Sequence, residues 1–239
     1  MRVVAIIQAR MGSTRLPGKV LKELCGESVL ARVVNRTRRA RLLEEVVVAT
    51  SVLPADEAIA RECERLSVAC LRGDECDVLD RYYQTAQAFS ADAVVRITSD
   101  CPLIDPELID QHVGCLLDKW NQIDLVTNTG FPLGLSVEAM PADVLARMKR
   151  MSDTDVLKEH VTTLAYVEPG LFRIENIRCA EDLSHLRWTV DTAEDLELVR
   201  LIFEHFGHDR FSWEDVLPVL KMHPDWLEIN QHVMQKSIG

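Results

Sequence analysis

The stretch RVVAIIQARMGSTRLPGKVL (residues 2–21) joins an apolar run to a basic segment that contains two glycines. We expect the apolar run to form a buried first strand and not a signal peptide, because no small-residue cleavage site follows it. The basic segment misses the Walker A phosphate-binding pattern. Five residues separate Gly12 from Gly18 instead of four, and Val20 stands where that pattern needs a magnesium-binding hydroxyl. A different kind of anion-binding loop is therefore expected here.

The charge distribution supports an anionic ligand at this loop. The chain of 239 residues has a net charge of −11, which argues against a nucleic-acid partner because phosphates would be repelled. Residues 1–45 nevertheless hold ten Lys and Arg against four Asp and Glu, a balance of +6, so the rest of the chain carries −17. Such a concentration of positive charge in an acidic protein favours a small anion as ligand.

Composition indicates a globular protein without a membrane segment. Hydrophobic residues make up 47% and charged residues 27% of the chain, and no apolar run approaches the length needed to span a bilayer. The seven cysteines form no C-x-x-C pair and no zinc spacing, so we expect reduced thiols in a cytoplasmic protein.

Apolar runs alternate with amphipathic stretches, which predicts an α/β fold with a mostly parallel sheet flanked by helices on both faces. Strands are expected at 2–9, 45–50, 67–72, 92–99, 124–128, 135–140, 172–178 and 186–190. Helices are expected at 28–41, 55–66, 77–89, 106–118, 153–166, 192–206, 212–221 and 224–235. With no linker or repeat, we expect one domain over 1–239 with a helical part at about 192–239.

Three helix starts are marked by side chains that cap helices. Asp105 precedes a proline at the first helical position, and Thr192 and Ser212 each have an aspartate three residues later. Asp105 is therefore better explained as a cap than as a ligand.

Polar clusters follow three of the expected strands, where ligands bind in open α/β sheets. In the first cluster, three cations and two hydroxyls could wrap a triphosphate, with a solvated basic turn as the alternative; they are Arg10, Arg15, Lys19, Ser13 and Thr14. Asp100 follows the strand at 92–99, and Asp191 follows the strand at 186–190. Each aspartate alone would be an ordinary turn residue. Together with the basic loop they fit a magnesium–nucleotide site, although the sequence does not show that they meet.

Several motifs together resemble the sugar cytidylyltransferases, in particular the type found in spore coat polysaccharide biosynthesis, which is related to the acylneuraminate and 3-deoxy-manno-octulosonate cytidylyltransferases. The motifs are ARMGSTRLPGKVL (9–21), DVLDRYYQTA (77–86), SDCPLIDP (99–106), GLSVEAM (134–140), EHVT (159–162) and VDTAEDL (190–196). The resemblance runs from residue 1 to about 205.

This resemblance implies a single-domain, Rossmann-like fold of the glycosyltransferase-A type. It also implies transfer of CMP from CTP to an acidic sugar, with Mg²⁺ as cofactor, pyrophosphate as product and a homodimer as a plausible assembly. Catalysis would rest on Lys19, Arg10 and Arg15, and Asp100 and Asp191 would hold the metal. The implied nucleotide-binding residues are Ala9, Arg10, Gly12, Ser13, Arg15, Lys19, Arg72 and Thr98, and the weaker substrate candidates are Glu138 and His160.

Two alternatives stay open at this point. The same loop would serve a nucleotidyltransferase that uses another nucleotide or a non-sugar acceptor such as a phosphonate. It would also serve a non-catalytic relative that only binds nucleotide. A dinucleotide oxidoreductase is disfavoured, because no G-x-G-x-x-G pattern follows the first strand.

Overall fold

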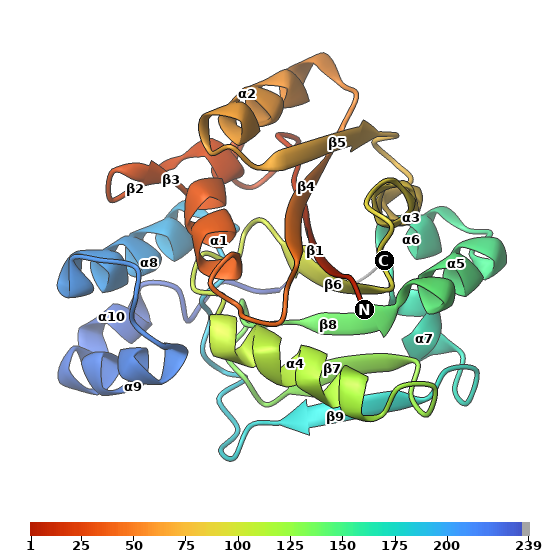
Figure 1. The fold of residues 1–239 in the computed structure, drawn as a ribbon. Coiled ribbons are helices and arrows are strands. Elements are labelled where there is room, and N and C mark those ends of the chain that lie inside the picture. Colours follow the sequence, from red (N-terminus) through yellow and green to blue (C-terminus); the bar gives the residue numbers. More distant parts are fainter. Residues whose placement is uncertain (236–239) are drawn as a thin grey trace.

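The first strand, β1 (Val3–Gln8), lies in the middle of the protein, with every residue from Val3 to Ile7 buried. A computed structural model describes residues 1–235 (Figure 1). The apolar, largely β-branched run VVAII suits a strand that is covered on both faces. β1 pairs in parallel with β4 (Glu45–Ser51) on one side and β6 (Ala93–Thr98) on the other.

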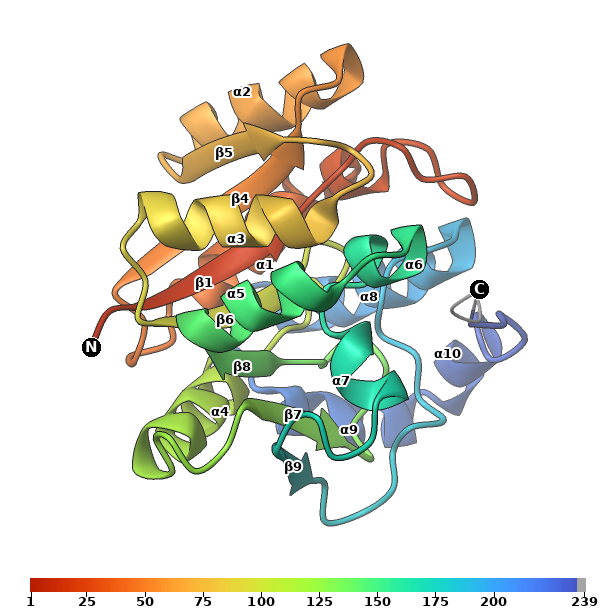
Figure 2. The same ribbon diagram turned by 90° about the vertical axis from the view of Figure 1, so that its right-hand side faces the viewer.

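These strands belong to a seven-stranded sheet with the order β5-β4-β1-β6-β8-β7-β9. The remaining members are β5 (Ala69–Gly73), β7 (Leu125–Thr129), β8 (Glu138–Pro141) and β9 (Ile174–Arg178). β8 is antiparallel to both of its neighbours, and the other pairs are parallel. The carboxyl ends of all strands except β8 therefore lie at one edge of the sheet, which is the edge toward which β1 runs in Figure 2.

Alternate residues of β1 face two separate apolar cores. Val3, Ala5 and Ile7 pack with one set of helices, whereas Val4 and Ile6 pack with another. The first set comprises α1 (Val29–Thr37), α2 (Glu57–Arg65), α4 (Pro106–Asp118), α8 (Ala193–Phe206) and α9 (Trp213–Met222). The second comprises α3 (Val78–Ala88), α5 (Ala142–Met151) and α7 (Thr163–Val167), which cover the opposite face (Figures 1 and 2).

The predicted fold class is confirmed: the chain forms a single α/β domain with a mostly parallel sheet flanked by helices. Seven of the eight expected strands are present within a few residues, and the expected caps are formed. Asp105 accepts hydrogen bonds from Glu107 N and Leu108 N, and both capping boxes are complete. The domain boundary at 239 stays a prediction, because residues 236–239 lie outside the described part of the chain.

The expected strand at 186–190 is wrong. This segment is extended, but its only pairing among the described residues is a single bridge between Arg187 and Leu133. Its backbone instead bonds to loops, since Trp188 N donates to Leu133 O and Val190 N donates to Asp100 O. Apolar and polar residues alternate in the sequence LRWTV, which resembles a strand, but all five residues are buried in the structure.

Other differences concern short elements. The helix expected at 153–166 is two helices, α6 (Asp155–Glu159) and α7, and the helix expected at 224–235 ends early as α10 (Pro224–Glu228). α5 was not predicted, although its buried Val144, Leu145 and Met148 have helical spacing. The short elements β2 (Glu23–Leu24), β3 (Glu27–Ser28), η1 (Lys19–Leu21) and η2 (Pro54–Asp56) were also missed.

No helix within residues 1–235 is both long and apolar enough to cross a membrane. All seven cysteines carry free thiols in the structure.

Gly134 allows the loop before β8 to lie against the segment that leads to Asp191. Its φ is +112°, and a Cβ there would lie 2.6 Å from Thr189 N and 2.7 Å from the carbonyl carbon of Trp188. Both neighbours are backbone atoms, so a side chain forces the two segments apart. We expect Gly134→Ala to lower the free energy of unfolding by about 3 kcal/mol or more, from strain and clash together.

Urea unfolding measures this loss, and Gly26→Ala is the matched control. Gly26 has a φ of +86°, but nothing lies within 4 Å of its would-be Cβ, so only the strain of about 1–2 kcal/mol applies. Equal losses in the two variants would show that the clash with the backbone of Trp188 and Thr189 adds nothing to the loss of stability.

Candidate active site

A cavity of about 310 Å³ lies at the carboxyl ends of β1 and β6. The loop at 9–19, which follows β1, forms one wall, and the start of α3 and the end of α6 form others. Ten of the residues predicted from the sequence line it: Ala9, Arg10, Gly12, Ser13, Arg15, Lys19, Thr98, Asp100, His160 and Asp191. Thr14, the second hydroxyl of the basic loop, lines it as well.

The loop at 9–19 is folded around Met11. Met11 O accepts hydrogen bonds from Ser13 N and Gly18 N, and Met11 N donates to the buried Asp56. Gly18 has a φ of +65°, a left-handed conformation that glycine adopts without strain, and it directly precedes the turn of η1. This turn carries Lys19 into the cavity, where its side chain is 12% exposed.

Lys19 brings the two aspartates together. Its Nζ lies 2.6 Å from Asp100 Oδ2 and 2.7 Å from Asp191 Oδ1. Asp100 follows β6, and Asp191 stands 91 positions later in the sequence, directly before α8. The convergence that the sequence could not show is therefore present, with both carboxylates directed at one cation.

These contacts shift two pKa values. Burial alone would lower the pKa of Lys19, but the charges of Asp100 and Asp191 outweigh it and raise that pKa. Burial would likewise raise the pKa of Asp100, but the Lys19 ammonium outweighs it and holds that pKa below its usual value. At neutral pH the cavity therefore contains the Lys19 ammonium against the ionised carboxylate of Asp100.

Asp191 is also held by two arginines. Arg15 Nη2 lies 2.7 Å from Asp191 Oδ2, and Arg187 Nη2 donates to the same oxygen at 2.8 Å. Arg187 in turn forms a bidentate pair with Asp195, which is fully buried. Three cations and three carboxylates thus form one balanced cluster, which includes the basic loop and the start of α8.

Arg10 is less restrained than Lys19. Its Nη2 lies 3.0 Å from Glu159 Oε1, and both side chains are 44% exposed. An exposed ion pair of this kind contributes little to stability, so Arg10 can exchange Glu159 for an anionic ligand. Arg81, also in the cavity wall, donates to the carbonyls of Asp74 and Glu75.

Arg72 and Glu138 do not line the cavity, and the ligand contacts predicted for them stay predictions. Arg72 is engaged elsewhere, because it donates to Ser51 O and Leu53 O and pairs with Glu57. Glu138 is buried in β8 and accepts hydrogen bonds from Arg96, Thr162 and Tyr166. That arrangement satisfies the Glu138 carboxylate within the protein, so it explains the residue without a substrate.

Several residues of the site were not predicted from the sequence. Gln8 and Arg81 line the cavity, and Arg187 and Asp195 support Asp191. Gln8 was recognisable as the polar end of an apolar strand. Asp195 was assigned only to the capping box, which it also forms, and no spacing pattern indicated its pairing with Arg187.

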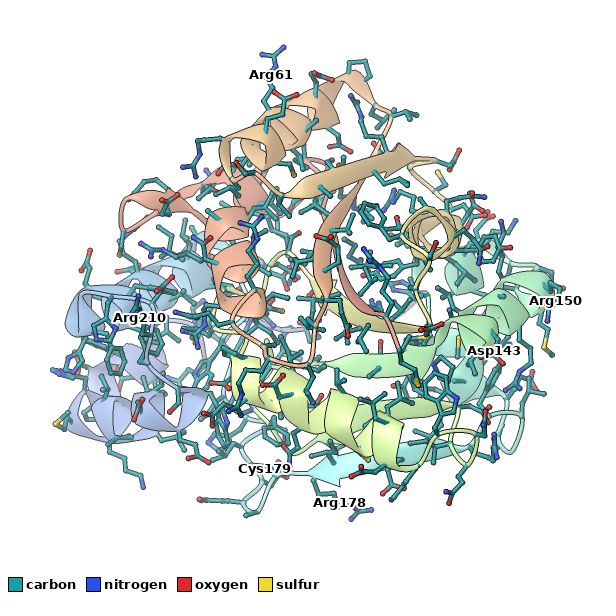
Figure 3. The ribbon with its side chains drawn as sticks, in the orientation of Figure 1. Arg61, Asp143, Arg150, Arg178, Cys179 and Arg210 are labelled. Carbon is teal, nitrogen blue, oxygen red and sulfur yellow. The ribbon has the colours of Figure 1, made fainter. Side chains whose placement is uncertain are left out.

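A second hollow of about 560 Å³ lies at the carboxyl ends of β7 and β9. Since β7 runs in the same direction as β6, this hollow and the cavity open on the same edge of the sheet. Its lining includes Asn128, Ser136, Arg178 and Cys179, and Figure 3 shows Arg178 and Cys179 at the end of β9.

A mostly parallel sheet with a cationic loop and two converging carboxylates at its carboxyl edge fits a nucleotidyltransferase fold. Residues 4–208 match the family model described as Cytidylyltransferase. The chain therefore belongs to the cytidylyltransferase family and is a nucleotidyltransferase.

Named relatives agree with this assignment. The chain is 32% identical over 231 residues to the spore coat polysaccharide biosynthesis protein SpsF of Bacillus subtilis, which covers 93% of this chain and 95% of the relative. A cytidylyltransferase structure from Leptospira borgpetersenii has a TM-score of 0.92 and 29% identity, covering 99% of this chain and all of the other. A CMP:2-keto-3-deoxy-manno-octonic acid synthetase complexed with CTP has the same fold, with a TM-score of 0.69 and 18% identity over 86% of this chain and 99% of the other.

Proposed function

We propose that the protein transfers CMP from CTP to a hydroxyl of an acidic sugar of the ulosonic or nonulosonic acid type, with release of pyrophosphate, for cell-surface polysaccharide synthesis. One observation carries the proposal. Asp100 and Asp191 converge on a single cation inside a cavity that a basic loop partly encloses. A nucleoside triphosphate needs both a cationic lining for its phosphates and carboxylates for the metal that accompanies it.

The residues present fit Mg²⁺. Two carboxylate oxygens already approach one cation within 2.7 Å, and magnesium is usually held by one or two carboxylates together with substrate phosphates and water. Within residues 1–235 no cluster of three or more His, Cys, Asp and Glu could hold a metal, so phosphate and water would supply the remaining ligands. Asp100 and Asp191 would hold Mg²⁺, which supplies charge neutralisation at the α-phosphate and acidifies an attacking hydroxyl.

The chain's own groups position and neutralise the triphosphate. Arg10 and Arg15 reach the cavity from the loop, and their guanidinium groups suit bidentate binding of phosphate oxygens. Lys19 is a compact charge that offsets negative charge developing on the leaving pyrophosphate. Ser13 and the backbone at Ala9 and Gly12 line the same wall, and Thr98 lies beside Asp100 for contact with the nucleoside.

The second hollow is the proposed acceptor site. It lies on the same edge of the sheet as the cavity, and Arg178 supplies a cation for the carboxylate of an acidic sugar. His160 lines the cavity and remains a candidate sugar contact, whereas Glu138 has a structural role in the described contacts. The name of the Bacillus subtilis relative supports a product destined for a polysaccharide.

Cytoplasmic location and a homodimer are part of the proposal. CTP and sugar acids are metabolites of the cytoplasm, and the free thiols suit that compartment. β9 is the last strand of the sheet order, and exposed apolar side chains lie on and near it, among them Tyr166, Val167, Leu171 and Ile174. An edge strand with exposed apolar neighbours favours contact with a second copy.

Nucleotide choice can be tested by thermal unfolding with Mg²⁺ and each of CTP, UTP, GTP and ATP. We expect CTP to raise the melting temperature most, because a ligand at 100 times its dissociation constant adds about 2.7 kcal/mol. Pyrophosphate release is then measured with CTP and a panel of 2-keto acid sugars. Stabilisation by UTP or ATP alone would exclude CTP as substrate, and CTP binding without release on any acceptor would favour a non-catalytic relative.

A further inference from the structure

The chain segment after α10 reaches the active site, although it lies beyond the residues that match the family model. The match ends at residue 208. Asn230 is nevertheless buried, and its Nδ2 lies 2.9 Å from both Arg187 O and Asp195 Oδ1. Gln235 Oε1 accepts a hydrogen bond from Arg187 Nη1 at 2.7 Å. The same segment meets the basic loop, since Arg15 Nη1 donates to Met234 O.

Arg187 and Asp195 fix Asp191 from two sides. Arg187 Nη2 donates to Asp191 Oδ2, which directs the other oxygen, Oδ1, toward the cation site. Asp195 Oδ2 accepts a hydrogen bond from Asp191 N at 2.9 Å and so holds the backbone of the same residue. The orientation of the Asp191 carboxylate therefore depends on the relative positions of the Arg187 and Asp195 side chains.

Asn230 holds Arg187 and Asp195 in these relative positions. Asp195 Oδ1 has two donors in the structure, Arg187 Nε and Asn230 Nδ2. Without the amide, Oδ1 keeps only Arg187 Nε, and the position of the carboxylate then depends on the bonds that Oδ2 accepts from Arg187 Nη2 and from the backbone of Asp191 and Thr192. The amide also donates a hydrogen bond to Arg187 O, so it links the backbone of Arg187 to the Asp195 carboxylate.

We infer that Asn230 is a positioning residue for the metal-binding carboxylate of Asp191, and that the C-terminal segment at 230–235 is part of the active site. This inference rests on the proposed function, in which Asp191 holds a divalent cation. Groups that orient a metal ligand from behind influence metal affinity strongly, typically by about 10- to 100-fold when they are removed.

The test is the affinity of the full-length protein for Mn²⁺ in the presence of CTP, with no acceptor and hence no turnover, followed by electron paramagnetic resonance. We expect Asn230→Ala to weaken Mn²⁺ binding about tenfold at a temperature where the variant is folded. The matched control is Gln231→Ala, which removes an exposed amide at the neighbouring position and should bind Mn²⁺ as the unmodified protein does. A purely structural role for Asn230 would lower the melting temperature and leave the Mn²⁺ affinity of the folded protein unchanged.

The variant Asp191→Asn distinguishes a failure of the positioning role from a failure of the proposed function. If Asp191→Asn loses Mn²⁺ affinity and Asn230→Ala does not, the positioning role is wrong and the proposed function stands. If Asp191→Asn itself binds Mn²⁺ normally, the metal assignment and the inference both fail. Should Asn230→Ala not fold, the exposed Gln235→Ala decides: a loss of about threefold, the size of one hydrogen bond, supports the role of the segment, and unchanged affinity overturns it.

Discussion

Asp191→Asn is expected to lower kcat for CMP transfer about a thousandfold, which corresponds to about 4 kcal/mol of lost transition-state stabilisation. Asp191 Oδ1 and Asp100 Oδ2 face one cation, and Mg²⁺ held there would neutralise charge at the α-phosphate. The amide keeps the shape of the side chain but removes its charge, so the metal loses a ligand while packing is preserved. Steady-state pyrophosphate release at saturating CTP measures the effect.

Asp124→Asn is the matched control for this variant. Asp124 is a buried carboxylate paired with Arg173 and Arg147, and it lies outside the cavity lining. Both substitutions remove a carboxylate from contact with two arginines, so both should cost stability. Only Asp191→Asn should lower kcat, and equal kcat losses in the two variants would count against a role for Asp191 in the reaction.

Lys19→Met is expected to lower the rate of CMP transfer and to raise the affinity for Mn²⁺. Transfer should fall about a hundred- to a thousandfold, because a cation that offsets charge on the leaving pyrophosphate is lost. Mn²⁺ binding without nucleotide should become tighter, because the ammonium between Asp100 and Asp191 competes for the same oxygens. Pyrophosphate release and electron paramagnetic resonance of free Mn²⁺ measure the two effects on one preparation.

Lys22→Met makes the same charge change three residues away, outside the cavity lining, and should leave both quantities near their original values. A Lys19→Met protein with weaker Mn²⁺ binding would contradict the competition derived from the two short contacts. Full activity in that variant would remove Lys19 from the catalytic groups.

The sequence was sufficient for the fold because β1 and its neighbours are apolar on both faces and are separated by amphipathic helices. It was less informative where tertiary contacts replace regular pairing. Apolar and polar residues alternate at 186–190 as in a strand, but the backbone of this segment bonds to Leu133 O and Asp100 O. No local sequence pattern specifies these partners. α6 and α7 were merged into one helix for the same reason, since the turn at 160–162 between them makes a tertiary contact, from the Thr162 hydroxyl to Glu138.

For the site, motif positions located the residues of the basic loop and both aspartates, but not their mutual geometry. The convergence of Asp100 and Asp191 depends on the strand order, which places the end of β6 beside the end of β1. Arg72 was assigned by motif position alone, and the structure shows its guanidinium bonded to Ser51 O and Leu53 O. Asn230 carried no signal in the sequence, because its partners become neighbours only when the C-terminal segment folds back onto Arg187.

A crystal structure with CTP and Mg²⁺ tests the central claim most directly. The account predicts triphosphate oxygens against Arg10, Arg15 and Lys19, and the metal bound by Asp100 and Asp191 with Lys19 moved from between them. Triphosphate bound elsewhere, or a metal that touches neither aspartate, would contradict it.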